Sequence, residues 1–130
     1  MNELDSLLPD ADFVALTCPL TAETENLIDA EALTRMKSTA HLVNVARGRV
    51  VDEVALIEAL ATGRIAGAGI DVKAEEPLAP SSPVWDMEHV LITPHTEGET
   101  GRYEDNVIEI LLDNLARLWR GEEQLRNQIV

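Results

Sequence analysis

Four short apolar runs that do not alternate with polar residues constrain the fold of this 130-residue chain more than any other feature. They occupy residues 12–17, 40–45, 65–72 and 90–93, and a proline lies within two residues of the end of the first and the last. Strands that are apolar on both faces are typical of parallel sheets covered by helices. The sequence therefore predicts an α/β fold with a parallel sheet, and we expect helices on both of its faces.

Helix patterns separate and follow these runs. Asp29 begins one, and Asp52 is a suitable N-cap for another over residues 53–62, which Gly63 would end. Their buried stripes are expected at Ala30, Leu33 and Met36 and at Val54, Ile57 and Leu60. A longer helix is predicted over residues 99–119. Its inward face is expected to be Val107, Ile110, Leu111, Asn114, Leu115 and Leu118.

The charge of the chain is strongly negative, because 24 Asp and Glu outnumber 10 Lys and Arg and give a formal net charge of −14. Such a surface repels phosphate backbones, so nucleic acid is not expected as a partner. Eight of the bases are arginine and only two, Lys37 and Lys73, are lysine. An acidic, lysine-poor surface is typical of a salt-adapted, halophilic protein, and an ordinary acidic cytosolic protein is the alternative.

The chain shows no signal for export or for a membrane partner. Its start, MNELDSLLPDADF, is acidic and lacks a basic segment followed by an apolar one. No apolar run approaches the length of a membrane span. The single cysteine, Cys18, excludes an intrachain disulfide and suits a reducing interior. These features predict a cytoplasmic protein.

Side chains capable of chemistry follow the ends of the predicted strands. Arg47 follows the second run, Asp71 and then Glu76 come at and after the end of the third, and His95 follows the fourth. In a parallel sheet these ends meet at one edge, where ligands bind. We therefore expect these side chains to converge on one site.

Arginine, glutamate and histidine together suit the reversible reduction of a 2-oxo acid. Arg47 would bind the acid group in a bidentate fork. His95 would give a proton to the ketone oxygen, and Glu76 would fix the tautomer of His95. Hydride would come from a nicotinamide.

Each residue also has a simpler explanation. Arg47 alone could pair with a surface acid, Glu76 is one of 24 acids, and His95 could be a satisfied core histidine. Asp71 could cap a loop through its side chain. Cys18 has no paired base and is expected to pack, not to act as a nucleophile. No His and Cys cluster has the spacing of a metal site, so no metal is expected.

Four ordered motifs, LLPDADFVALTCPLTAETENLID, MKSTAHLVNVARGRVVDEVALIEAL, GAGIDVKAEEPL and VLITPH, resemble the D-isomer-specific 2-hydroxyacid dehydrogenases. The resemblance implies that Arg47, Glu76 and His95 are the catalytic trio and that NAD or NADP is the cofactor. Asp71 would bind the nicotinamide carboxamide. The other implied cofactor-binding residues are Thr17, Cys18 and Pro19 on the adenosine and ribose side, and Ala46 and Gly98, with Arg47 and His95, near the nicotinamide.

The resemblance also implies that the chain is part of a longer enzyme. The family's G-x-G-x-x-G motif does not occur here, and Gly67-Ala68-Gly69 is only a partial match with Val72 in the third position. Residues 1–98 would be the C-terminal half of a dinucleotide-binding domain, lacking its first βαβ half, and residues 99–130 a closing C-terminal helix and tail. After His95 the family often shows small residues, whereas this chain has T-E-G-E.

Such a part of a domain would expose an apolar sheet edge. We expect the missing N-terminal half, a second copy of the chain or rearranged helices to cover it. The isolated chain is expected to be inactive, and the substrate of the parent enzyme to be a small 2-oxo or 2-hydroxy acid. The alternative is a catalytically inactive module on the same scaffold that binds a nucleotide or a protein. Retention of the whole trio argues against that alternative.

The salt-adapted hypothesis predicts that the free energy of unfolding rises with salt. Added ions screen the mutual repulsion of the acidic groups, so stability should increase between about 0.1 M and about 1 M KCl. Urea unfolding curves at several KCl concentrations measure this. A midpoint that stays level or falls would favour the ordinary acidic protein.

Overall fold

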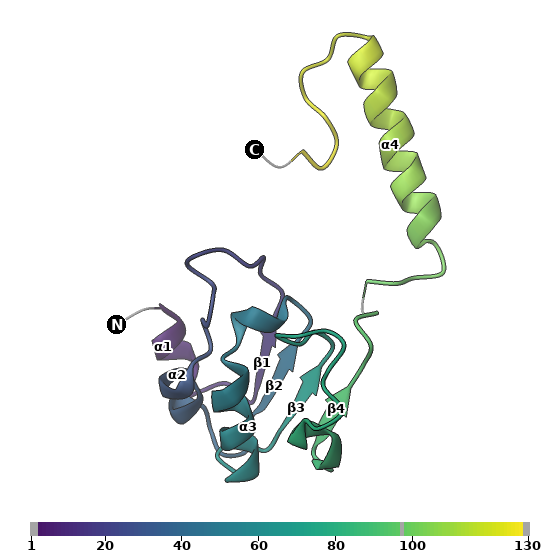
Figure 1. Cartoon of the computed structure of the whole chain (residues 1–130). Coiled ribbons are helices and arrows are strands. Elements are labelled where there is room, and N and C mark those ends of the chain that lie inside the picture. Colours follow the sequence, from purple (N-terminus) through teal and green to yellow (C-terminus); the bar gives the residue numbers. More distant parts are fainter. Residues whose placement is uncertain (1–2, 97, 129–130) are drawn as a thin grey trace. The chain divides into compact units, whose positions relative to one another are not determined.

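The computed structural model describes residues 3–96 and 98–128. The chain divides into two compact units, Met1–Glu97 and Gly98–Val130. The sheet and the short helices belong to the first unit, and one long helix belongs to the second (Figure 1).

The first unit contains the four predicted strands and both predicted short helices. In chain order its described elements are α1 Glu3–Leu7, β1 Phe13–Leu16, α2 Ala30–Arg35, β2 His41–Asn44, the 3-10 turn η1 Gly48–Val50, α3 Glu53–Ala61, β3 Gly67–Ile70, the 3-10 turn η2 Pro83–Asp86 and β4 Val90–Ile92. The apolar pattern did not predict α1, which is shorter than two turns. The prediction of alternating strands and helices is confirmed.

Aspartate side chains begin both predicted helices. The carboxylate of Asp29 accepts a hydrogen bond from the backbone nitrogen of Ala32 at 2.8 Å, and that of Asp52 accepts one from Ala55 at 3.1 Å. These bonds satisfy backbone donors that the first turn of a helix leaves unpaired. Gly63, just after α3, has a φ of 68°, a conformation that glycine adopts without a Cβ clash.

The strands form one parallel sheet in the order β1-β2-β3-β4. Their carboxyl ends are level. Leu16 pairs with Asn44, Asn44 with Ile70, and Ile70 with Ile92. The chain segments that follow all four strands therefore leave the sheet at the same edge.

The helices of the first unit cover one face of this sheet, which corrects the prediction of helices on both faces. Leu42 on β2 and Ala68 on β3 are buried on the covered face, where α2 and α3 contact each other. On the opposite face, Phe13 is 71% exposed and Leu91 69% exposed. The reason is topological, because right-handed crossovers that all move in one direction along a sheet place their helices on the same side.

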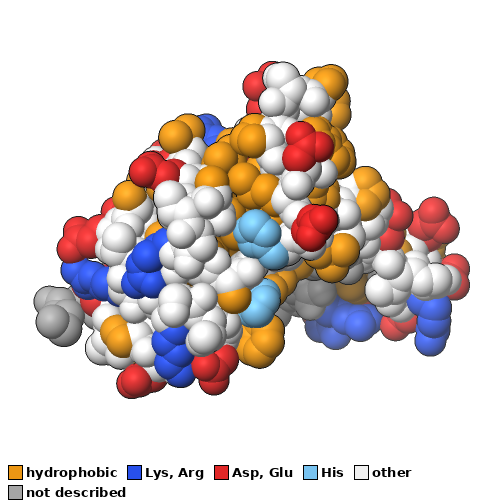
Figure 2. Space-filling view, turned by 90° about the horizontal axis from the view of Figure 1, so that it is seen from below, with side chains coloured by type: hydrophobic (Ala, Val, Ile, Leu, Met, Phe, Trp, Pro, Cys, Tyr) orange, Lys and Arg blue, Asp and Glu red, His pale blue; other side chains and the backbone are white. Residues whose placement is uncertain are grey.

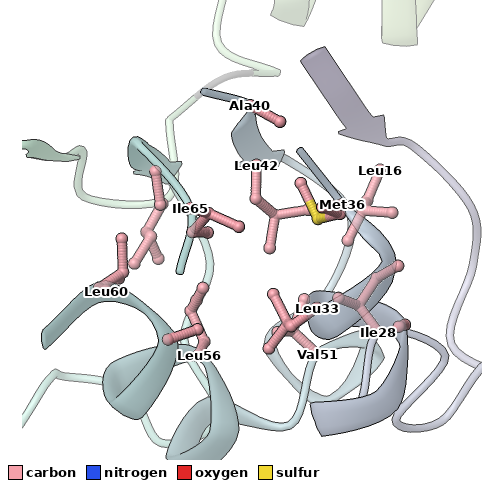
Figure 3. Packing of buried hydrophobic residues seen from close by; sticks show 14 of the residues in the cluster. Leu16, Ile28, Leu33, Met36, Ala40, Leu42, Val51, Leu56, Leu60 and Ile65 are labelled. Atoms are coloured by element: carbon pink, nitrogen blue, oxygen red, sulfur yellow. The ribbon is translucent and has the colours of Figure 1, made fainter. Parts of the chain in front are cut away.

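The core lies between the covered face and these helices, as Figure 3 shows. Its members include Leu16 and Leu42 from the strands and Leu33 from α2. In α3 the buried residues are Leu56, Ala59 and Leu60. The predicted stripe is therefore wrong at Val54, which is 76% exposed. The actual stripe follows the i, i+3, i+4 spacing of a helix face.

The second unit contains α4, Tyr103–Trp119, which begins later than the predicted residue 99. Arg102 precedes it without a side-chain cap. No described residue of α4 is buried, and Leu111 and Leu118 of the predicted inward face are each more than half exposed. Within its own unit, the helix is held to the tail by Asn114, whose side-chain oxygen accepts from the backbone nitrogen of Arg126 at 2.7 Å. The predicted inward face of α4 stays a prediction.

Acidic side chains are spread over the face seen in Figure 2, in keeping with the net charge of −14. Among the described residues, no helix is both long enough and apolar enough to cross a membrane.

Two glycines on β3 provide a test of the packing on the open face. A Cβ on Gly67 would lie 2.4 Å from the carbonyl oxygen of His89, whereas a Cβ on Gly69 would meet only Val43, at 3.7 Å. Gly67→Ala should therefore destabilise the protein by about 1–3 kcal/mol. Gly69→Ala should be neutral or stabilising by up to about 1 kcal/mol, since alanine restricts the unfolded chain. Urea unfolding of both variants measures the difference, and equal effects would contradict this packing.

Candidate active site

The level strand ends bring the predicted site residues of the first unit to one edge of the sheet. Thr17 follows β1, Ala46 and Arg47 follow β2, Asp71 follows β3, and His95 comes shortly after β4. This is the edge at which open parallel sheets bind ligands.

His95 and Glu76 form a hydrogen-bonded pair at this edge. Nδ1 of His95 lies 2.9 Å from Oε2 of Glu76. The second carboxylate oxygen, Oε1, accepts a hydrogen bond from the backbone nitrogen of Lys73, also at 2.9 Å. His95 has a φ of 61°, a conformation that is uncommon for residues other than glycine and recurs at functional sites.

The charge state of Glu76 determines the tautomer of its partner. The hydrogen bond from His95 and that from the Lys73 backbone hold the pKa of Glu76 below its ordinary value. Glu76 is therefore ionised near neutral pH, and an ionised carboxylate can only accept hydrogen bonds. Nδ1 of His95 must then carry a proton, which leaves Nε2 as the nitrogen that exchanges a proton with a ligand.

Asp71 is buried and holds the segment that carries His95. Asp71 is only 2% exposed. Its Oδ1 accepts a hydrogen bond from the Thr93 hydroxyl and another, at 3.1 Å, from the backbone nitrogen of Thr96. The loop-capping role considered from the sequence is thus present in the structure. Asp71 links the end of β3 to the loop on both sides of His95.

Arg47 lies on the surface of the turn after β2. Its Nη1 donates to the carbonyl oxygen of Ala46 at 2.6 Å, and among the described residues no carboxylate pairs with its guanidinium. Buried Asn44 braces this turn, because its side chain accepts from the Ala46 nitrogen and donates to the Arg47 carbonyl, each at 3.1 Å. The exposed cationic end of Arg47 can therefore reach an anionic ligand.

The remaining predicted cofactor residues have less distinctive surroundings. Thr17 is exposed, Cys18 packs partly buried against the core, and the Pro19 carbonyl accepts from the Thr24 hydroxyl at 2.7 Å. Ala46 is buried at 4% exposure. Gly98 lies in the second unit and is exposed.

A pocket of about 360 Å³ adjoins the His95–Glu76 pair. Its walls include both members of the pair, and they are otherwise mostly apolar. The remaining lining residues are Lys73, Pro77, Leu78, Trp85, Ile92, Thr93 and Pro94.

Sequence reasoning did not single out Asn44, Lys73 or Thr93. Asn44 is a polar residue inside an apolar run, and that interruption was the one available signal. Lys73 and Thr93 act through hydrogen bonds to backbone or to Asp71, which leave no spacing pattern in a sequence. Among the described residues, no group of three or more His, Cys, Asp or Glu side chains could hold a metal ion.

Fold and site together define a Rossmann-type α/β unit with an arginine and a histidine–glutamate pair at the carboxyl edge of its sheet. Residues 1–96 match the sequence profile described as D-isomer specific 2-hydroxyacid dehydrogenase, NAD binding domain. The chain belongs to this family. The match confirms the predicted family and the nicotinamide class of cofactor.

Curated relatives share much of this sequence. A glyoxylate reductase of Korarchaeum cryptofilum is 45% identical over 119 residues, which are 92% of this chain and 36% of that protein. A glyoxylate/hydroxypyruvate reductase B of Pectobacterium carotovorum is 45% identical over 120 residues, 92% of this chain and 38% of that protein. The chain thus spans well under half the length of these relatives.

Solved structures confirm the predicted fold class. A D-isomer specific 2-hydroxyacid dehydrogenase from Xanthobacter autotrophicus, in complex with NADPH and MES, matches with a TM-score of 0.90 and 40% identity over 98% of this chain and 51% of that chain. The NAD-complexed enzyme of Lactobacillus delbrueckii matches with a TM-score of 0.83 and 36% identity over 99% of this chain and 43% of that chain.

The low pKa of Glu76 predicts how its contribution to stability varies with pH. A carboxyl group whose pKa is lower in the folded state stabilises the fold above its unfolded pKa, about 4.3, and this stabilisation is lost as the pH falls through the folded pKa. The wild type should therefore have a higher free energy of unfolding than Glu76→Gln near neutral pH, and this difference should shrink as the pH falls below about 4.3. Urea unfolding from neutral pH to below that value measures it, with Glu75→Gln at the exposed neighbouring position as the control. A difference in the free energy of unfolding that grew toward low pH would contradict the His95–Glu76 hydrogen bond.

Proposed function

We propose that this chain is the C-terminal part of the cofactor domain of an enzyme that reversibly reduces 2-oxo acids to D-2-hydroxy acids with NAD(P)H. The observation that carries the proposal is the His95–Glu76 hydrogen bond of 2.9 Å at the same sheet edge as Arg47. The names of the relatives, glyoxylate and glyoxylate/hydroxypyruvate reductases, support a small 2-oxo acid as the substrate.

Arg47 binds the carboxylate of the substrate in this proposal. A guanidinium presents paired donors that match the two oxygens of a carboxylate. The turn that carries it is held by Asn44, so its backbone is in place before a ligand arrives. Binding the acid group next to the carbonyl also orients that carbonyl relative to the sheet edge.

His95 supplies or removes the proton. As an imidazolium it donates from Nε2 to the ketone oxygen during reduction, and as a neutral imidazole it accepts the hydroxyl proton in the reverse direction. Glu76 keeps the proton on Nδ1 in both directions and stabilises the positive charge that forms on the ring. Glu76 is thus a supporting group, and Nε2 is the reacting atom.

The residues present fit the nicotinamide end of a dinucleotide. The edge offers the exposed hydroxyl of Thr17, after β1, for polar contact. Ala46 after β2 and Asp71 after β3 are buried beneath the neighbouring segments of the same edge. We propose that Thr17, Cys18 and Pro19 face the ribose and adenosine, that Asp71 faces the carboxamide, and that Ala46 and Gly98, with Arg47 and His95, lie near the ring. When bound, the nicotinamide supplies or accepts the hydride.

We propose that the isolated chain lacks turnover and acts together with an N-terminal portion or a second copy. The relatives are more than twice as long as the matched region, and β1 is an edge strand whose Phe13 is 71% exposed. An unpaired apolar edge favours association. A cytoplasmic location and salt adaptation are further parts of the proposal, supported by the single cysteine and the net charge of −14.

The full-length enzyme containing this chain should oxidise NADH with glyoxylate or hydroxypyruvate. Arg47→Ala and His95→Ala should each lower kcat/KM by roughly 100-fold or more, because one removes carboxylate binding and the other removes proton transfer. Steady-state assays that follow NADH absorbance measure both effects.

Arg49→Ala is the matched control for the arginine. Arg49 lies close in sequence but pairs with Glu25 on the surface, so its loss should leave kcat/KM nearly unchanged. Full-length protein that binds NADH but stays inert on a broad panel of 2-oxo acids would establish the inactive-module alternative instead.

A further inference from the structure

Lys73 lies at the centre of the candidate site although its chemistry is not used in the proposed reaction. It is one of two lysines in a chain with eight arginines, and it is half-buried just beyond the end of β3. Burying part of a lysine is unfavourable unless its ammonium is hydrogen-bonded. The contacts of this ammonium therefore indicate what the residue does.

The ammonium bridges the ends of two neighbouring strands. Nζ donates to the backbone carbonyl oxygen of Asp71 at 2.9 Å and also to that of Thr93. Asp71 directly follows β3 and Thr93 directly follows β4. Among the described residues, the backbone ladder between these strands ends with the bond from the Thr93 nitrogen to the Ile70 oxygen, at 3.1 Å. Lys73 thus joins the two main chains at the point where the ladder stops.

The backbone of Lys73 also contacts Glu76 and the turn that carries Arg47. Its nitrogen donates to Oε1 of Glu76 at 2.9 Å. A Cβ on Gly48 would lie only 1.9 Å from the carbonyl carbon and oxygen of Lys73, so the turn that carries Arg47 packs directly on this peptide group. Displacing Lys73 would therefore disturb the segments that hold Arg47, Glu76 and His95 together.

We propose that Lys73 is a positioning residue of the site, whose ammonium clamps the ends of β3 and β4 and thereby holds Glu76 against His95. This inference rests on the proposed function for its effect on catalysis, but not for its effect on structure. Lysine suits the role better than arginine, because a compact ammonium can direct its three donors to two closely spaced carbonyl oxygens. A planar guanidinium has a fixed fork that matches a carboxylate better.

The structural test uses the full 130-residue chain and nitrogen NMR of the His95 ring, which distinguishes a protonated Nδ1 bonded to Glu76 from an unbonded one. Lys73→Met removes the ammonium at similar volume, and Lys73→Arg keeps the charge but changes its shape. In both variants the His95 ring should lose the nitrogen NMR signature of a protonated Nδ1 bonded to Glu76, while circular dichroism shows that the fold is retained. Lys37→Met is the matched control, because the Lys37 ammonium also binds a backbone carbonyl, that of Asp10 at 2.7 Å. Lys37 lies between α2 and β2, before the amino end of β2 and away from the candidate site.

The wild-type signature in folded Lys73→Met would overturn the proposal, and so would its loss in Lys37→Met. If Lys73→Arg keeps the wild-type His95 signature while Lys73→Met loses it, the positive charge and not the geometry of the ammonium is required. That result would also overturn the proposal. A further variant is needed in case Lys73→Met or Lys73→Arg fails to fold. Lys73→Gln, which keeps donors without the charge, then provides the second variant and should show partial loss of the signature; an unchanged signature there would again contradict the clamp.

The catalytic test uses the full-length enzyme. Lys73→Met should lower kcat by roughly 10- to 100-fold with a smaller change in KM for the 2-oxo acid, because misplacing an acid–base pair by about 1 Å has effects of this size. An altered His95 signature with no change in kcat would leave the clamp standing and contradict the proposed catalytic role. An unaltered signature in an enzyme that His95→Ala inactivates would contradict the clamp and leave the proposed function standing.

Discussion

The level register of four parallel strands is the constraint on which the rest of the structure depends. Because Leu16, Asn44, Ile70 and Ile92 lie in one row, the residues that follow them share a single edge. Side chains that are far apart in the chain then need only short loops to approach each other. The hydrogen bonds of Asn44, Asp71 and Lys73 keep those loops close to the strand ends.

The direction of the strand order determines which face of the sheet is covered. All crossovers of the first unit move the same way, so α2 and α3 share one side and the apolar side chains of Phe13 and Leu91 remain exposed on the other. In a doubly wound sheet, helices reach the second face through strands that run in the opposite order. The proposed N-terminal portion is the kind of segment that could supply them.

The edge of the sheet that carries the candidate site could be predicted from the sequence, but the hydrogen bonds that hold its residues could not. Arg47, Glu76 and His95 each follow an apolar run within a few residues, and that position indicated an edge of the sheet. Most of the bonds that hold them run to backbone carbonyls and nitrogens, as with Lys73 on Asp71 and Thr93. Such bonds accept many residue types at many spacings, so no motif marks them. The error at Val54 has a related cause, since apolar character does not say which side of a helix meets the core.

By itself the sequence determined the order and type of the four strands and of α2, α3 and α4, the helix starts at Asp29 and Asp52, and the family. These features depend on local chemistry or on contiguous motifs. Only the tertiary structure decided that one face of the sheet is covered and that Glu76 bonds to His95 through Nδ1. It also placed the Lys73 ammonium between two strand ends. Those features depend on distances between segments that are remote in the chain, and such distances are established only when the strands align.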